Sequence, residues 1–184
     1  MEQLNPRARH DQFGSKINRD HSPVLAYGLP WLSILLGSLA PMLPVIAAAP
    51  IIPPLGYMLL LSWRLLRPGL LPMWAGLPLG LFDDLFSGQP LGSAILLFSL
   101  SMIAIDLIEL RFPWRAFRQD WLLAALFLAL YLFLSALFSG AQISAIQLGL
   151  IAPQIMLSIL LFPVIASIVS LLDRMRLKRV RKFG

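Results

Sequence analysis

Six apolar segments alternate with short polar or Pro/Gly-rich stretches along this chain of 184 residues. The apolar segments cover approximately residues 24–43, 53–66, 70–86, 91–110, 121–138 and 146–172. Several approach the roughly 20 residues that a membrane-spanning helix needs. The pattern predicts an all-α, polytopic membrane helix bundle with about six transmembrane segments.

Prolines interrupt this pattern most heavily between the first two segments. They stand at positions 41, 44, 50, 53 and 54, and a regular helix is not expected to run through all of them. We therefore expect a short second helix that begins near Pro53. Residues 44–52 are expected to be irregular or re-entrant, which a membrane tolerates only where protein buries the backbone. Whether they cross, enter or skirt the bilayer stays open.

Other prolines modify the later helices. We expect Pro72 in the first turn of the third helix, a kink at Pro78, and possible kinks at Pro153 and Pro163 in the sixth.

The composition supports a membrane protein and excludes several kinds of chemistry. Charged residues make up 13% of the chain, against about 25% in soluble domains, and 58% of residues are hydrophobic. The absence of cysteine excludes disulfides, thiol catalysis and cysteine-ligated metals. Both histidines, His10 and His21, lie in the polar first 22 residues. We expect no metal and no cofactor.

The basic residues predict the topology. All fifteen Lys and Arg lie in residues 1–22, in the expected loop between the second and third helices (Arg64 and Arg67), between residues 111 and 118, or after residue 173. None lies near residues 44, 88 or 141. With six spans, all the cations face one side, which the positive-inside rule makes the cytoplasm.

The predicted organisation follows from this topology. It is a polar cytoplasmic N-terminal arm (1–22), a transmembrane helical domain (23–173) and a basic cytoplasmic tail (174–184), with both termini inside the cell. We expect the first apolar segment to be a retained anchor and not a cleaved signal peptide. The tail is expected to contact anionic lipids, and nucleic-acid binding is not expected.

The stretch from Gly76 to Gly92 holds the main candidate site. Gly76, Gly80 and Asp84 recur every four residues, so on a helix they share one face. Two glycines four apart allow a neighbouring backbone to come close, and a carboxylate in an apolar helix needs a polar partner or water. Asp83 points about 100° away. We expect Asp83 near a wet mouth at the outer end of the helix, and no shared acid/base pair with Asp84.

Polar residues on the later helices predict interhelical contacts. Gly92, Ser99 and Asp106 form a stripe that should face other helices. Asp106 and Glu109 lie beside Arg111 and should form an interfacial ion pair with it. The pairs Tyr131 with Ser135 and Gln154 with Ser158 are four residues apart. They are more typical of hydrogen bonds between helices than of substrate ligands.

Enzyme signatures are missing from the sequence. It contains no Gly-x-Ser-x-Gly, no His-Glu-x-x-His and no P-loop. No apolar segment carries a histidine that could act as a base, and a serine nucleophile would lack an activator. We expect that the protein is not an enzyme.

Segments 54–68 and 80–92 resemble the MreD family, the bacterial rod-shape-determining membrane proteins. In that family a proline-led short helix ends in basic residues and is followed by a Gly-x-x-x-Asp-Leu-x-Ser-Gly-x-x-Leu-Gly element. Here this element falls on Gly80, Asp84, Leu85, Ser87, Gly88, Leu91 and Gly92. Asp83, the prolines of 41–54 and the long polar N-terminal arm are not part of the family pattern.

The resemblance implies a non-enzymatic scaffold of the cell-elongation machinery in the bacterial inner membrane, which helps maintain rod shape and position peptidoglycan synthesis. It implies an MreC-like bitopic periplasmic protein as partner and, indirectly, MreB, RodA and a class B penicillin-binding protein. The alternative is a small-molecule transporter or a substrate-binding membrane subunit, with a midplane cavity lined by Asp84, Ser99, Tyr131 or Gln154.

We expect the partner's single membrane helix to dock against the shared glycine face. The predicted partner-binding residues are Gly76, Gly80, Asp84, Ser87, Gly88, Leu91 and Gly92. On this hypothesis Gly80→Leu abolishes docking and leaves expression intact.

Overall fold

The computed structural model describes residues 23–42, 52–112, 116–140 and 145–176. The N-terminal arm, most of the proline-rich stretch and most of the basic tail lie outside these ranges, so the predictions made for them stay predictions. The described elements are α1 (Pro23–Ser38), η1 (Ala40–Met42), α2 (Leu55–Leu66), η2 (Met73–Ala75), α3 (Gly76–Ser87), α4 (Ser93–Arg111), α5 (Phe117–Phe138) and α6 (Ala145–Arg176). No strand occurs in these ranges, which confirms the all-helical prediction.

Three of these helices are long and apolar enough to cross a membrane. They cover Ser93–Arg111, Phe117–Phe138 and Ile151–Arg176. Residues 27–42 and α2 form shorter apolar helices. Large apolar side chains such as Leu96, Leu107 and Leu126 stand exposed on α4 and α5, as expected for helices that face lipid. The molecule is therefore a helical membrane protein.

The short helix α2 forms the centre of the bundle. It packs against α1, α4, α5 and α6, and residues such as Tyr57, Leu61 and Trp63 are at most 1% exposed. Tertiary packing supplies most of the stability of a short helix, and here four helices surround α2. This explains why a segment of 12 residues, too short to span a bilayer alone, is helical here.

Polar side chains fix α2 against three neighbours. The Trp63 indole N–H donates to Ser33 Oγ of α1 at 2.8 Å. The Tyr57 hydroxyl and Ser101 Oγ of α4 lie 2.6 Å apart, and the Tyr57 ring stacks on Tyr131 of α5 with centroids 4.1 Å apart. These contacts set the rotation of α2 about its axis.

Two proline predictions are corrected. The first helix does not continue to residue 43: α1 ends at Ser38, and Pro41 lies in the 3₁₀ turn η1. Pro78 does not kink a helix that begins at residue 70, because α3 begins only at Gly76. Pro78 therefore lies in the first turn, where a missing N–H removes no helical hydrogen bond. Pro153 and Pro163 lie inside α6, as the sequence pattern predicts.

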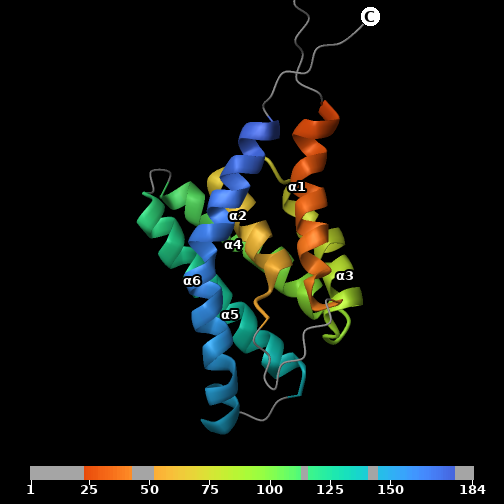
Figure 1. The fold of residues 1–184 in the computed structure, drawn as a ribbon, viewed down its shortest axis with the longest axis vertical. Coiled ribbons are helices and arrows are strands. Elements are labelled where there is room, and N and C mark those ends of the chain that lie inside the picture. The colour runs from red at the N-terminus through yellow and green to blue at the C-terminus, as the bar shows by residue number, and fades with distance from the viewer. Residues whose placement is uncertain (1–22, 43–51, 113–115, 141–144, 177–184) are drawn as a thin grey trace, which may run out of the picture.

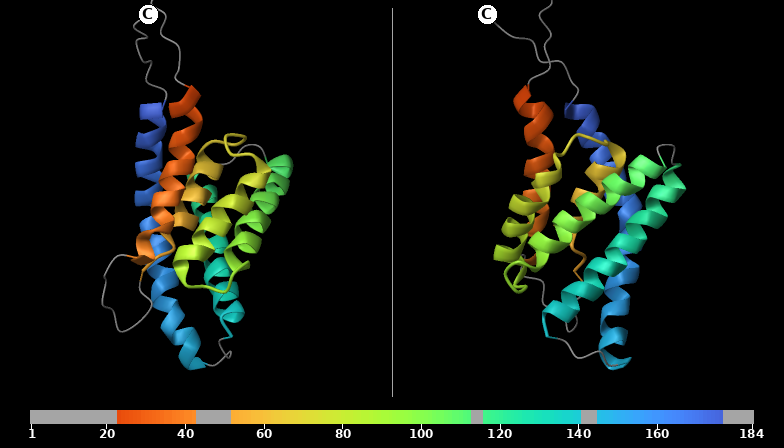
Figure 2. Two further views of the ribbon diagram at one scale, coloured as in Figure 1. Left: turned by 90° about the vertical axis from the view of Figure 1, so that its right-hand side faces the viewer. Right: turned by 180° about the vertical axis from the view of Figure 1, so that it is seen from behind.

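The start of α1 and the end of α6 lie at the same end of the bundle (Figure 1). Helices α3 and α4 run antiparallel as a hairpin beside the pair α1 and α6 (Figure 2). The turn between α3 and α4 lies toward the other end of the bundle (Figure 1). The hairpin therefore places the candidate turn away from the termini.

Candidate functional site

The glycine face of α3 packs directly against α4 of the same chain. A Cβ atom added at Gly80 would lie 2.6 Å from Ile95 Cα, and one added at Gly76 would lie 2.8 Å from Ser99 Cα. Real Cβ atoms do not approach backbone this closely, so both positions require glycine. The close approach predicted from the spacing is present, but the neighbour is α4. The groove at these glycines is therefore filled by α4, and the predicted docking of a partner helix on the shared glycine face stays a prediction that α4 leaves little room for.

Asp84 holds the first turn of α4. Its carboxylate accepts hydrogen bonds from the backbone N–H groups of Gly92 and Ala94, both at 2.8 Å, and from Ile95 at 3.3 Å. Ser93 Oγ donates to it at 3.2 Å. The N-terminus of a helix has unpaired N–H groups and a partial positive charge, so it stabilises a buried anion. Asp84 is 3% exposed and needs no cation.

The turn that joins α3 and α4 depends on two glycines. Gly88 ends α3 with φ of 70°, and Gly92 precedes α4 with φ of 99°, a region that side chains with a Cβ rarely adopt. Ser87 is partly buried, whereas Gly88 and Leu91 are exposed, Leu91 to 74%. Of the seven predicted partner-binding residues, Gly88 and Leu91 are thus the ones most open to a partner.

Asp83 does not lie at a wet mouth, because it is only 6% exposed. The Tyr131 hydroxyl of α5 donates to its carboxylate at 3.4 Å. A Cβ atom added at Gly56 of α2 would lie 2.9 Å from Asp83 Oδ1. Asp83 thus faces α2 and α5 while Asp84 faces α4, which confirms that the two carboxylates form no shared pair.

The transporter alternative requires four side chains to line one midplane cavity, but the structure places them against other parts of the chain. Gln154 donates from Nε2 to the Ile52 carbonyl at 2.7 Å, Tyr131 contacts Asp83, and Asp84 is held by α4. Ser99 lies where its backbone approaches Gly76. Asp84, Tyr131 and Gln154 are thus engaged within the chain, and Ser99 Oγ is buried without a hydrogen-bond partner among the described residues. Three of the four side chains are therefore not directed into a common cavity. Ser158 bonds to the Gln154 carbonyl of its own helix, so its predicted interhelical role is wrong.

At the other end of the bundle, Arg64 forms a buried ion cluster with α4. It was predicted to be a loop cation, but it lies in the last turn of α2 with its side chain 4% exposed. Its guanidinium pairs with Asp106 and, at 3.0 Å, with Glu109. The two acids are in an ion cluster as predicted, but the arginine that pairs with both of them is Arg64, which sequence reasoning did not identify. Because other helices surround α2, the Arg64 side chain is buried within the bundle.

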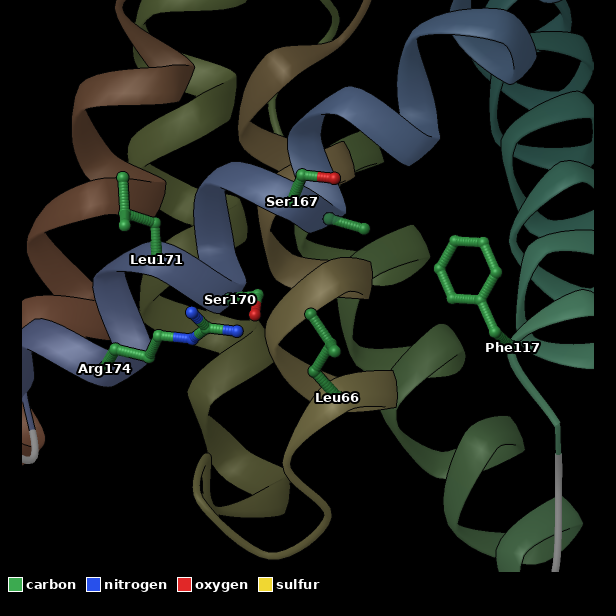
Figure 3. A pocket seen from close by; sticks show the side chains of 7 residues that line it. Leu66, Phe117, Ser167, Ser170, Leu171 and Arg174 are labelled. Carbon is green, nitrogen blue, oxygen red and sulfur yellow. The ribbon is translucent and has the colours of Figure 1, made fainter.

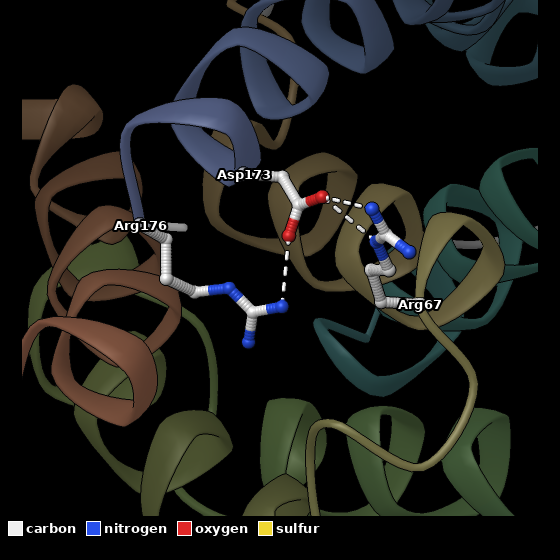
Figure 4. Close-up of polar contacts among 3 residues, drawn as sticks. All are labelled: Arg67, Asp173 and Arg176. Atoms are coloured by element: carbon white, nitrogen blue, oxygen red, sulfur yellow. Dashed lines mark hydrogen bonds and ion pairs between the residues drawn. The ribbon is translucent and has the colours of Figure 1, made fainter. Parts of the chain in front are cut away.

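A second cluster joins α2 to the end of α6. Asp173 Oδ2 accepts a hydrogen bond from Arg67 Nε at 2.7 Å, and Arg176 lies 2.9 Å from Asp173 Oδ1 (Figure 4). Sequence reasoning did not predict this contact across the fold, although an acid preceding a run of cations, Asp173 before Arg174 and Arg176, could have signalled it. The ends of α2, α4 and α6 are thus tied together by ion pairs.

The fold and the site define an all-helical membrane protein. Every acidic side chain in the described ranges interacts with another group of the same chain. Among the described residues no three acidic, histidine or cysteine side chains are grouped to hold a metal.

The chain belongs to the MreD family. The family model for rod shape-determining protein MreD matches residues 24–176, nearly the whole chain. Membership implies a role in determining rod shape, in a family of membrane proteins that is not known for enzymes. Comparison with curated proteins found no match, and comparison with solved structures found none either.

Proposed function

We propose that the protein is a non-enzymatic scaffold of the cell-elongation machinery in the bacterial inner membrane, which holds an MreC-like bitopic periplasmic protein in place. Through that partner it would act on MreB, RodA and a class B penicillin-binding protein. Family membership supports the role in rod shape. The many polar contacts within the chain support a rigid scaffold better than a transporter that alternates between conformations.

The proposed topology has six membrane segments, counting the short ones, with both termini in the cytoplasm. The common end of α1 and α6 supports an even number of crossings. Arg64, Arg67 and Arg176 lie at the cationic end, whereas the described connection between α3 and α4 carries no Lys or Arg. The positive-inside rule then places that connection in the periplasm.

The proposed docking surface is the exposed side of the α3–α4 hairpin. Leu77, Leu81 and Leu85 recur every four residues on the face of α3 turned away from α4, and they are 53%, 48% and 61% exposed. Leu91 extends this surface at the turn. The observation that carries the proposal is Leu91: an exposed apolar side chain on a turn held rigidly by Asp84 and two glycines. A rigid apolar projection suits an anchor residue of an interface.

The test compares two exposed leucines at opposite ends of α4. Leu91→Asp should abolish co-purification of the MreC-like protein and fail to restore rod shape in cells that lack the native gene. Leu110→Asp is the control, because Leu110 is 83% exposed near the cationic end. Both variants should purify in normal amounts. Equal co-purification with both variants would remove this docking surface.

A further inference from the structure

A cavity of about 410 Å³ lies between the end of α2, the start of α5 and the last turns of α6 (Figure 3). Its lining consists of Leu66, Phe117, Ala166, Ser167, Ser170, Leu171 and Arg174. This volume is within the range of small-molecule sites, about 300–1,000 Å³. The cavity lies at the cationic end of the bundle, away from the α3–α4 turn, so the proposed docking surface does not explain it.

The lining changes from apolar to cationic along α6. Ser167, Ser170, Leu171 and Arg174 are spaced by three, four and seven residues, so they share one face over about 10 Å of helix. Leu66 and Phe117 supply apolar surface across from them, and the Arg174 side chain extends toward Ser170 (Figure 3). The cavity therefore offers a hydrocarbon-like wall beside a polar, positively charged edge.

The charged edge has no acidic partner of its own. Asp173 is engaged by Arg67 and Arg176, while Arg174 has no ion pair within the described part of the chain. The Ser170 hydroxyl likewise has no hydrogen-bond partner among the described residues, although nearby Ser167 donates to the Pro163 carbonyl at 2.7 Å. Asp173 thus pairs with two guanidinium groups, and Arg174 adds a third positive charge in the cavity lining. Phe117 is the first residue of α5, whose N-terminal end carries a partial positive charge that Asp120 in the same turn offsets in part.

We propose that this cavity is a binding site for one anionic phospholipid of the leaflet at the cationic end of the bundle. The Arg174 guanidinium and the Ser170 hydroxyl bind the phosphate, and acyl chain carbons lie against Leu66, Phe117 and Leu171. Charge-assisted hydrogen bonds from arginine to phosphate are roughly twice as strong as hydrogen bonds between neutral groups. A lipid fits better than a soluble anion because Phe117 and Leu171 are 58% and 60% exposed and offer apolar surface beside the charge.

The site is distinct from attraction of lipids by the part of the basic tail that follows α6, residues 177–184. A basic tail attracts many anionic lipids through its total charge, whereas this cavity binds a single lipid at a defined place. Native mass spectrometry of the full chain in detergent, with phosphatidylglycerol or phosphatidylethanolamine added, measures this directly. We expect one retained phosphatidylglycerol per chain and at least about tenfold weaker retention of phosphatidylethanolamine, because the latter is zwitterionic.

Three variants separate the cavity from the tail. Arg174→Gln removes the charge and should weaken phosphatidylglycerol retention about tenfold, as expected for one charge-assisted hydrogen bond. Ser170→Phe fills the cavity without changing charge and should weaken it similarly. Arg181→Gln removes the same charge from the tail and should change retention less than about twofold. Circular dichroism checks that all three are folded, which is expected because Arg174 is exposed and Ser170 is only partly buried.

The opposite results would overturn the proposal. Equal loss with Arg181→Gln would assign retention to the tail, and full retention by Ser170→Phe would exclude the cavity. Displacement of the lipid by an equal concentration of glycerol 1-phosphate would assign the site to a soluble phosphate compound. Equal retention of phosphatidylethanolamine would remove the role of charge. None of these readouts depends on the MreC-like partner, so this proposal and the proposed function fail independently.

Discussion

The two ends of this bundle stabilise buried and partly buried carboxylates in different ways. At the α3–α4 turn, Asp84 is held by backbone N–H groups and a serine hydroxyl at the start of α4. At the other end, Asp106, Glu109 and Asp173 are held by arginine side chains. Helix N-termini and arginines are both suitable partners for an anion near lipid.

The proposed topology accounts for this difference. Under the positive-inside rule a periplasmic turn is poor in Lys and Arg, so an acid there is best stabilised by backbone groups. A backbone site fixes the two helices relative to each other, because several N–H groups must meet one carboxylate. An arginine site joins helices through longer, more adaptable side chains. The contrast can be tested at each end by substitution.

The largest effect is expected at Arg64. Arg64→Met leaves Asp106 and Glu109 without the cation that pairs with them, which should lower the free energy of unfolding by about 3–5 kcal/mol. The measurement is equilibrium unfolding of the purified protein in detergent. Combining Arg64→Met with Asp106→Asn and Glu109→Gln should restore most of this loss. Equal stability of the single variant and the native chain would contradict a structural role for the cluster.

Asp84 should come next. Asp84→Ala leaves the N–H groups at the start of α4 unpaired, which should lower the free energy of unfolding by about 1.5–3 kcal/mol. Asp84→Asn keeps one acceptor oxygen and should lose less. The same unfolding measurement applies to both. A larger loss for the asparagine variant would mean that backbone capping is not what holds the carboxylate.

The glycine face should be similarly sensitive to added volume. Gly80→Ala places a Cβ against Ile95 Cα and should cost about 1–3 kcal/mol of unfolding free energy. Gly28→Ala in α1 is the control, because nothing lies within 4 Å of a Cβ added there, and it should be neutral or stabilising. Melting in detergent compares the two. A native-like melting temperature for Gly80→Ala would show that the two backbones can separate. Gly80→Leu should accordingly lower the yield of folded protein, and not only the binding of a partner.

The smallest effect is expected at Arg67. Its side chain is 51% exposed, so Arg67→Gln should change the unfolding free energy by only about 0–1 kcal/mol. The effect should shrink further in high salt, because exposed ion pairs are screened. Unfolding at two ionic strengths measures this. A loss of unfolding free energy as large as that for Arg64→Met would mean that solvent exposure does not determine how much each ion cluster contributes to stability.

The fold was predictable because membrane helices are encoded by length and apolarity. The cleanest helix, α5, was expected from residue 121 and begins at 117. The predicted helix boundaries were wrong near Pro41 and Pro78. The effect of a proline depends on whether a helix has already begun before it, and packing decides where the helix begins. Arg64 was misplaced because the sequence does not indicate that α2 is surrounded on every side.

The candidate site was predictable only in part. The spacing of Gly76, Gly80 and Asp84 indicates a close neighbour, but spacing cannot identify that neighbour. The structure assigns it to α4, the next helix along the chain, which the turn at Gly88 and Gly92 brings alongside α3. The direction of Asp83 followed from helix geometry, whereas its burial depends on Tyr131, 48 residues away.

Cysteine labelling tests the opposite placement of the two ends most directly, because the native chain has no cysteine. Leu91→Cys marks the α3–α4 turn and Lys182→Cys marks the tail, and each is exposed to a membrane-impermeant maleimide on intact spheroplasts. We predict that Leu91→Cys is labelled at once and that Lys182→Cys is labelled only after the membrane is opened. Immediate labelling of Lys182→Cys together with protection of Leu91→Cys would contradict the account.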